Sequence, residues 1–455
     1  MAPQRRIDVV LDSVKRLLRI GATANLLNLL QKQHPADLAL VLGSLLATER
    51  QAVFSLLVER SPRVAMETVS EMGAEDGAKL LTGRSAEEVA KLLQELPSDD
   101  AAALIDYLPQ ELQSEVLELM RRRESQEVES LLEYGEQTAG RIMNPQVFAL
   151  NEDLTVGEAI TALQSSRDVE MVFYLYVVDE RRHLVGVTSL RRLLLVSPET
   201  PLKRIMTPEV TNVRVDTDQE EVARLVASYN LLAVPVVDEG NKLAGVVTVD
   251  DVIDVIKDEA AEDLLRLAGV SGDERIETPV SEAIRKRLPW LGINLITAFV
   301  AASVVAMFEG TIQQVTALAI FMPIVAGMGG NAATQTLTVI VRGLALGEVS
   351  FSSARKALAK EAAIGLGNGV VLGLVAAGVA WLTKQDPMLG LVLGMAMLVN
   401  LFVAATAGTL VPLGLKALKV DPALGSAVFI TTFTDMVGFA AFLGLATVFL
   451  RYLVR

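Results

Sequence analysis

Five long apolar segments toward the C-terminal end constrain the fold of this chain more than any other feature. Each segment is long enough to cross about 30 Å of hydrocarbon as a helix. A large soluble protein with a buried core would not combine five such segments with loops whose charge alternates. The sequence therefore predicts a five-helix membrane domain, with spans at 289–308, 315–341, 362–383, 388–415 and 423–450.

The charges of the flanking loops predict how these spans are oriented. If the residues before the first span are cytosolic, the segments on that side hold nine Lys and Arg residues, against three on the other side. The positive-inside rule then places the N-terminus in the cytosol and the C-terminus outside. Residues 1–13 lack the apolar core and cleavage site of a signal peptide. We expect a multi-pass protein of the inner (cytoplasmic) membrane.

Residues 1–275 have a different composition and predict a separate part that stays in water. They carry 47 acidic and 29 basic side chains, a net charge of −18, whereas the remainder carries +4. The chain has no Cys and only two His, so thiolate sites are excluded and His-based zinc sites nearly so. Any metal ion must be held by oxygen atoms. No nucleophile and base constellation or phosphate loop is visible, so we expect no enzyme.

Residues 1–138 show helical spacing without the alternation of strands. The run Pro35-Ala-Asp37 recurs 62 residues later as Pro97-Ser-Asp99. Pro at the first helical position with an acid in the first turn is typical of a helix start. The pattern predicts a small superhelix of stacked short helices, although helical packing alone also explains it.

A second internal repeat is clearer. Met143-Asn-Pro145 pairs with Met206-Thr-Pro208, and Leu184-Val-Gly-Val187 pairs with Leu243-Ala-Gly-Val-Val247. Each copy reads strand, helix, strand, turn, strand, helix, which predicts an α+β fold of small sheets covered by helices. This order resembles a tandem pair of CBS domains, at 139–199 and 200–256. The resemblance implies a pseudo-twofold module that often binds adenine nucleotides.

Only the second copy keeps the pattern that contacts a ribose in such domains. Gly245, Thr248 and Asp251 match that pattern, whereas Arg191 stands at the matching place in the first copy. The resemblance therefore implies at most one nucleotide site of this kind, at Thr248 and Asp251. Whether ATP binds there stays open.

An acidic helix directly precedes the first span, at 251–275. Like charges four residues apart destabilise an isolated helix by about 0.2–0.5 kcal/mol per pair. A bound cation would relieve this repulsion, whereas a solvated acidic face is the ordinary explanation. The place of the helix beside the membrane favours the cation. On one face of this helix and along its edge lie the acidic residues Asp251, Asp254, Asp258, Glu259, Glu262 and Asp263.

The last span carries a carboxylate near the middle of the bilayer. Asp435 lies 12 residues into the span, which is roughly 18 Å at 1.5 Å per residue. An intramembrane carboxylate costs at least about 2.5 kcal/mol and by default marks a transport pathway. Thr431, Thr432 and Thr434 add hydroxyl oxygens beside it.

The second span contains residues that permit a broken helix. Pro323 is followed by Gly327, Gly329, Gly330 and Asn331, and unwound backbone at this depth is tolerated only against protein or water. Oxygen ligands around a watery lumen suit a hard divalent cation such as Mg²⁺, which gives up its water reluctantly. Such a pore would pass the ion largely hydrated. Helix packing through small residues and a buried Asp paired with a neighbour are the alternatives.

Several motifs in the same order resemble the MgtE family of magnesium channels across essentially the whole chain. They are the stretch 323–335, Arg342-Gly-Leu-Ala-Leu-Gly-Glu348, Val420-Asp-Pro-Ala423 and Thr434-Asp435. The resemblance implies a homodimer in the lipid bilayer with a central Mg²⁺-selective pore, and no nucleic-acid partner. Together with the neighbouring hydroxyls, it gives a predicted pore set of Asp435, Gly330, Asn331, Thr334 and Thr431.

The resemblance also implies a gate. The helix from Asp251 to Gly269 matches the plug helix of the family, so regulatory Mg²⁺ between cytosolic carboxylates would hold the pore shut. This chain departs from some members at Thr334 and Ser228, where they have Asn and Asp. The implied regulatory positions are Asp99, Asp216, Asp218, Asp251, Asp254, Glu259, Glu262, Asp263 and Asp421.

Two other classes of function remain open at this point. One is a CBS-regulated secondary transporter or exporter of another cation, which an inverted repeat between spans would favour and five spans do not offer. The other is a nucleotide-sensing scaffold anchored in the membrane, which leaves Asp435 unexplained. The competition of Co²⁺, Mn²⁺ and Ca²⁺ with Mg²⁺ is not readable from the sequence.

Overall fold

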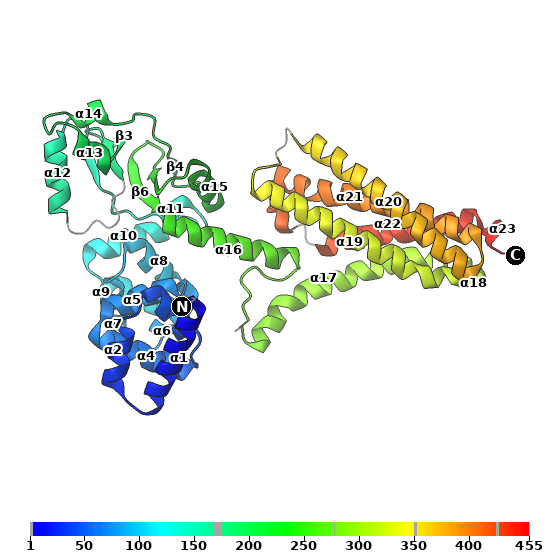
Figure 1. Cartoon of the computed structure of the whole chain (residues 1–455), viewed down its shortest axis with the longest axis horizontal. Coiled ribbons are helices and arrows are strands. Elements are labelled where there is room, and N and C mark those ends of the chain that lie inside the picture. Colours follow the sequence, from blue (N-terminus) through cyan, green and yellow to red (C-terminus); the bar gives the residue numbers. More distant parts are fainter. Residues whose placement is uncertain (1–2, 167–173, 277, 350–352, 425–426, 455) are drawn as a thin grey trace. The chain divides into compact units, whose positions relative to one another are not determined.

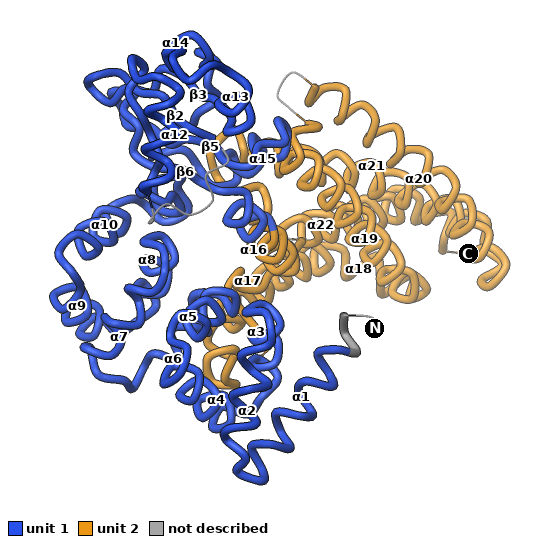
Figure 2. Tube along the Cα trace, turned by 60° about the vertical axis from the view of Figure 1, so that its left-hand side comes forward, with its two compact units in different colours: residues 1–256 blue, residues 257–455 orange. Residues whose placement is uncertain are grey.

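The computed structural model describes residues 3–166, 174–276, 278–349, 353–424 and 427–454 (Figure 1). The chain forms two compact units, Met1–Ile256 and Lys257–Arg455 (Figure 2). The first unit contains short helices and two small sheets. The second contains the long apolar helices.

The first unit begins with stacked short helices, as predicted. His34 caps α3 by accepting a hydrogen bond from Ala36 N at 3.3 Å, and Pro35 is the first helical residue. In the second copy Pro97 is the cap and α8 begins at Ser98, so that helix starts one residue later than the repeat predicts. The helices are α1 Pro3–Arg19, α2 Thr23–Leu30, α3 Pro35–Gly43, α4 Ala47–Arg60, α5 Pro62–Glu71, α6 Ala74–Leu81, α7 Ala86–Leu93, α8 Ser98–Asp106, α9 Gln110–Leu119, α10 Arg122–Leu132 and α11 Ala139–Ile142.

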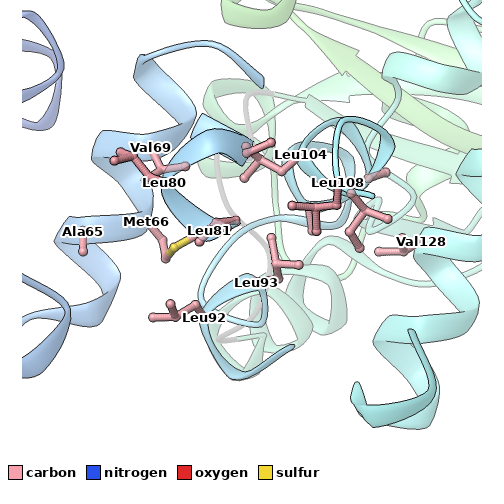
Figure 3. Close-up of a cluster of buried hydrophobic side chains, with 14 of the residues drawn as sticks. Ala65, Met66, Val69, Leu80, Leu81, Leu92, Leu93, Leu104, Leu108 and Val128 are labelled. Atoms are coloured by element: carbon pink, nitrogen blue, oxygen red, sulfur yellow. The ribbon is translucent and has the colours of Figure 1, made fainter. Parts of the chain in front are cut away.

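One core joins these helices. Met66, Leu81, Leu93 and Leu104 are almost completely buried between neighbouring helices (Figure 3). Burying each such side chain contributes about 1.5–3 kcal/mol. The same core includes Val234 of the second sheet, so the helices and that sheet fold as one body.

The two CBS-like repeats form two three-stranded sheets of identical topology. In each, the first strand is parallel to the second and the second is antiparallel to the third. The elements of the first repeat are β1 Ala149–Asn151, α12 Val156–Ser165, β2 Tyr174–Val178, β3 Leu184–Ser189, α13 Leu190–Leu195 and α14 Leu202–Ile205. Those of the second are β4 Val213–Arg214, α15 Gln219–Tyr229, β5 Ala233–Val237, β6 Leu243–Thr248 and α16 Val249–Leu267.

Reciprocal contacts explain why the repeated motifs contain Gly and Met. A Cβ on Gly186 would lie 2.5 Å from Met206 Sδ, and a Cβ on Gly245 would lie 2.6 Å from Met143 Sδ. Each strand glycine therefore makes room for the methionine that opens the other repeat. This exchange is the reciprocal packing expected of the pseudo-twofold module that the resemblance to CBS domains implies.

The second unit contains five helices long and apolar enough to cross a membrane within the described residues. The fifth begins later than predicted, and residues 425 and 426 of its predicted range lie outside the described residues. The elements are α17 Val280–Ala306, α18 Glu309–Gln314, α19 Ala317–Ala345, α20 Ala354–Lys384, α21 Pro387–Ala417, the 3₁₀ turn η1 Pro422–Leu424, α22 Ala427–Val448 and α23 Leu450–Leu453.

The second predicted span is an unbroken helix. Helix α19 continues through Pro323 and through the glycine-rich segment up to Asn331 and beyond. The helix break that these residues permit does not occur, nor is Gly329–Asn331 a turn. Neighbouring helices explain the glycines instead, because small residues let helix backbones approach closely.

Candidate functional site

The predicted pore residues gather where α19 meets α22. A Cβ on Gly330 would lie 3.3 Å from Thr431 Cγ2, so the two helices are in close contact there. Asp435 is one turn beyond Thr431 on α22 and is half-buried. The structure thus brings Gly330, Thr431 and Asp435 to one face between two membrane helices.

The remaining pore candidates lie on the same part of α19. The Thr334 hydroxyl donates to the Gly330 carbonyl oxygen at 3.0 Å, so it is engaged within its own helix. Asn331 is exposed beside it. Both residues are within one turn of Gly330, and neither contacts Asp435 by a hydrogen bond in the described part of the chain.

The three threonines before Asp435 point to different neighbours. Thr432 donates a hydrogen bond to Thr297 Oγ1 of α17 at 3.0 Å. Thr434 is buried, and its hydroxyl donates to the Thr431 carbonyl oxygen at 2.8 Å. Thr431 turns its methyl group toward Gly330, since a Cβ on Gly330 would lie 3.3 Å from Thr431 Cγ2. Its hydroxyl donates to the Val428 carbonyl oxygen of the same helix at 3.1 Å.

Acidic residues of α8 and the start of α16 form a first cluster in the first unit, here called the Asp99 cluster (Asp99, Asp100, Asp250, Asp251 and Asp254). The Thr248 hydroxyl donates to Asp251 Oδ2 at 2.6 Å. The Ser70 hydroxyl donates to Asp100 Oδ1 at 2.7 Å, and Asn144 Nδ2 donates to Asp99 Oδ1 at 3.4 Å. These partners are all neutral.

Burial and mutual repulsion disfavour ionisation of this cluster. Burial, then the charge of Asp251, raises the pKa of Asp99 well above its usual value. Burial, with the charges of Asp250 and Asp100 adding to it, raises the pKa of Asp251 to about 7. Two unit charges 4 Å apart repel by about 1–4 kcal/mol, depending on the effective dielectric. In the folded chain these carboxyls therefore favour a bound proton or cation over the free carboxylate, since no described base forms an ion pair with Asp99, Asp100 or Asp251.

A second cluster lies in the second unit and has a basic residue at its centre. This Arg266 cluster consists of Glu259, Glu262, Asp263, Arg266 and Asp421. Arg266 forms ion pairs with Glu262 and with Asp421. Burial, then the charges of Asp421 and Glu259, raises the pKa of Asp263 to about 6, although Arg266 opposes the shift. The ion pair with Asp421 joins α16 to the segment that precedes the last span.

Sequence reasoning missed Arg266 although the sequence carried a signal for it. Arg266 is four residues after Glu262, the spacing at which opposite charges on a helix pair. Its second partner, Asp421, is distant in sequence and could be found only from the fold. The end of the same helix also contacts the membrane helices, since a Cβ on Gly269 would lie 3.4 Å from Val428 Cγ2 of α22.

Two predicted regulatory residues have other partners. Asp216 pairs with Arg214 at 2.9 Å, which lowers the Asp216 pKa. Asp218 caps α15 by accepting from Glu220 N at 2.8 Å. Both side chains are exposed. Within the described residues, no three acidic or His side chains are close enough together to hold a metal ion.

A cavity of about 450 Å³ lies beside Thr248, the residue predicted to contact a nucleotide. Its walls include Phe148, Tyr174, Tyr176 and Arg121. The Tyr176 hydroxyl is buried and has no hydrogen-bond partner among the described residues. The wall also contains Arg63 and Arg123 and the acids Glu95 and Glu124, so the cavity combines aromatic surface with several charged groups.

Comparisons with known proteins match most of the chain. Residues 322–445 match a family model described as a divalent cation transporter, and residues 33–137 match the MgtE intracellular N domain. Residues 139–199 and 202–258 match the CBS domain. The magnesium transporter MgtE of Thermus thermophilus is 36% identical over 447 residues, which are 96% of this chain and 98% of that relative. This chain belongs to the MgtE family.

Two further MgtE proteins are also similar to this chain. The magnesium transporter MgtE of Enterococcus faecalis is 40% identical over 332 residues, 73% of each chain. A crystal structure of the cytosolic domain of the Mg²⁺ channel MgtE in complex with ATP is 39% identical and has a TM-score of 0.51, covering 54% of this chain and 99% of that one. Membership confirms the predicted family and fold class, a multi-pass membrane protein with a helical N-terminal domain and a CBS pair.

Proposed function

We propose that this protein is a Mg²⁺-selective channel that imports magnesium down its electrochemical gradient and closes when cytosolic Mg²⁺ is high. In this proposal residues 1–138, 139–199 and 200–256 sense Mg²⁺, residues 251–275 form the plug, and residues 276–455 conduct as a homodimer. The sensing part lies in the cytosol and the C-terminus outside. The single observation that carries the pore is the meeting of Gly330, Thr431 and Asp435 on one face between α19 and α22.

The chemistry of this face fits a hydrated divalent cation. One carboxylate at Asp435, with the Thr431 hydroxyl a turn away, offers oxygen atoms to the waters of Mg²⁺. The glycine at position 330 lets α19 approach α22 closely at this face, since a Cβ there would lie 3.3 Å from Thr431 Cγ2. A largely hydrated ion would thus pass between polar oxygens without losing its water shell.

The acidic clusters support gating by the transported ion. Carboxylate oxygens are ligands that Mg²⁺ prefers, and the described side chains that donate hydrogen bonds to Asp99, Asp100 and Asp251 are neutral. Mg²⁺ at these residues would supply the missing positive charge and hold α8 against α16. By linkage, the compact state must bind Mg²⁺ more tightly than the spread state.

Two further parts of the proposal concern the plug and the nucleotide. Leu267 at the end of α16 packs against Ala333, Ile430 and their neighbours in the membrane helices, the place a plug would need. ATP would occupy the cavity beside Thr248, as suggested by the relative whose cytosolic domain was solved with ATP.

The test is Mg²⁺ flux into liposomes containing the full-length protein. Asp435→Ala should abolish flux, because the only carboxylate of the described pore face is lost. Glu309→Ala, which removes an exposed carboxylate elsewhere in the second unit, should leave flux unchanged. Normal flux through Asp435→Ala would refute the pore assignment, and flux that requires a Na⁺ or proton gradient would favour a secondary transporter.

A further inference from the structure

The amide of Asn400, in the middle of α21, lies where α19 and α22 meet. The side chain is fully buried. Its Nδ2 donates to the Val325 carbonyl oxygen of α19 at 2.9 Å, while its Oδ1 is buried with no hydrogen-bond partner in the described structure. A Cβ would lie 2.2 Å from Nδ2 on Gly329 and 2.6 Å from it on Gly438. Both neighbouring helices therefore have glycine at the positions where a side chain would clash with this amide.

The contacts of Asn400 are tied to the pore face by helix geometry. Val325 is one turn before Gly329, so its carbonyl oxygen already accepts the helical bond of that turn and Asn400 uses its second lone pair. Gly329 adjoins Gly330, the residue that contacts Thr431. One glycine of the pair thus packs on Asn400 and the next faces the pore.

The same relation holds on α22. Asp435 lies four residues after Thr431 and three residues before Gly438. The contact of α22 with Gly330 and its contact with Asn400 therefore lie on either side of Asp435, within about one helical turn of it. A shift of α19 against α22 would break both contacts together.

We propose that Asn400 is a positioning residue for cation selectivity, whose amide sets the spacing between α19 and α22 on which the Asp435 pathway depends. It acts through the two helices and does not touch the ion. This inference rests on the proposed function for the pathway itself. The competing explanation is an ordinary interhelical hydrogen bond, which would stabilise the bundle by about 0.6–2 kcal/mol without affecting selectivity.

The first measurement is the ratio of Mg²⁺ to Ca²⁺ flux in liposomes. Asn400→Leu keeps a similar volume but removes the donor, and a branched apolar end would meet Gly329 and Gly438. We expect the ratio to fall at least about tenfold, a loss of about 1.4 kcal/mol of discrimination. Asn368→Leu, at an exposed site on α20, is the matched control and should keep the ratio.

A second measurement reports the geometry without any flux. The chain contains no Cys, so a pair introduced by Gly330→Cys and Thr431→Cys reacts without background. A Cβ at position 330 would lie 3.7 Å from Thr431 Cβ, within the disulfide range of about 3.5–4.5 Å. Asn400→Leu should slow this cross-link strongly. It should not slow a control pair at Thr311 and Thr447, whose hydroxyl oxygens are 2.8 Å apart near the other end of α22.

A third measurement tests the same contact with a different variant, in case Asn400→Leu does not fold. Gly438→Ala should also lower the flux ratio, because its Cβ meets the amide. Adding Asn400→Ser, which shortens the side chain but keeps a donor, should restore the ratio. An unchanged cross-linking rate in Asn400→Leu overturns the proposal, and so does a failed rescue. If the wild type passes no Mg²⁺, the proposed function fails, while the cross-linking rate still decides the role of Asn400.

Discussion

The two acidic clusters differ in the groups that interact with their carboxylates. In the Asp99 cluster, the carboxylates of Asp99, Asp100 and Asp251 receive hydrogen bonds from neutral groups in the part of the chain that the structure describes. In the Arg266 cluster, a guanidinium pairs with Glu262 and Asp421. Among the described residues, no base forms an ion pair with these three carboxylates, whereas the second cluster contains its own base.

This difference separates two roles that the sequence assigns alike. Binding of a cation to Asp99, Asp100 and Asp251, which have no ion-pair partner among the described residues, would make the stability of the first unit depend on cation concentration, as a sensor requires. A cluster closed by Arg266 holds the end of α16 to the segment before the last span at any cation concentration. We infer that the first cluster senses Mg²⁺ and that the second transmits the result to the membrane helices.

The largest expected effect comes from removing one acid of each cluster together. Asp251→Ala with Glu259→Ala should leave the proposed channel conducting at millimolar internal Mg²⁺, because each acidic cluster loses a carboxylate of α16 on which the proposed closure depends. The measurement is current inhibition by internal Mg²⁺ in membrane patches.

The single variants sharpen the comparison between the clusters. Asp251→Ala should account for most of the lost Mg²⁺ sensitivity, and Glu259→Ala for less. Glu180→Ala, an exposed acid on a CBS turn, is the control and should be inhibited normally. Wild-type inhibition of the double variant would exclude these residues from gating.

Replacing Arg266 should make the second cluster resemble the first. Arg266→Gln leaves Glu262, Asp263 and Asp421 without their base. We expect a loss of about 1–2 kcal/mol in the free energy of unfolding in EDTA, below the ~3–5 kcal/mol of a fully buried pair, because the Arg266 side chain is 29% exposed.

The distinctive sign of this change is a new response to Mg²⁺. The melting temperature of Arg266→Gln should rise with added Mg²⁺ more than that of the wild type, since the ion replaces the lost charge. Arg285→Gln, at an exposed site before the first span, should behave as wild type. An equal Mg²⁺ response in all three proteins would mean that the two clusters do not differ in this way.

The sequence predicted those features that repeat along the chain. Five apolar spans and two CBS-like repeats follow from local patterns in the sequence. The repeated residues recur because they contact each other across the two repeats, as Gly186 and Met206 do. The continuous course of α19 was not predictable, because glycine permits both a break and a close helix contact. The partners of Gly329 and Gly330, which are Asn400 and Thr431, decide between the two and lie on other helices.

Polar pairs between residues distant in sequence could not be predicted, for the same reason. Thr248 and Asp251 pair within one pattern and could be read from the sequence. Ser70 and Asn144 acquire their acidic partners only after segments distant in sequence are packed, and so does Arg266 its second partner, Asp421. Which cluster has a base is therefore a property of the fold, and the sequence predicted one continuous acidic stripe.

The smallest expected effect is a dependence of stability on pH that belongs to the Asp99 cluster. Asp251 has a pKa of about 7 in the folded chain, above its ordinary value of 3.8. The folded state thus holds this proton more tightly than the unfolded state, so stability is lost as the pH rises through 7. In EDTA we expect the protein to be less stable at pH 8 than at pH 6 by up to about 1 kcal/mol, read as melting temperature.

Asp251→Asn is the variant that assigns this pH dependence. It should flatten the change between pH 6 and pH 8, because the titrating group is absent. Saturating Mg²⁺ should flatten it in the wild type as well, since a cation beside Asp251 favours the ionised form and lowers its pKa. If Asp251→Asn keeps the full pH dependence, the uncompensated charge of the first unit lies at other residues, and the contrast with the Arg266 cluster must be placed there.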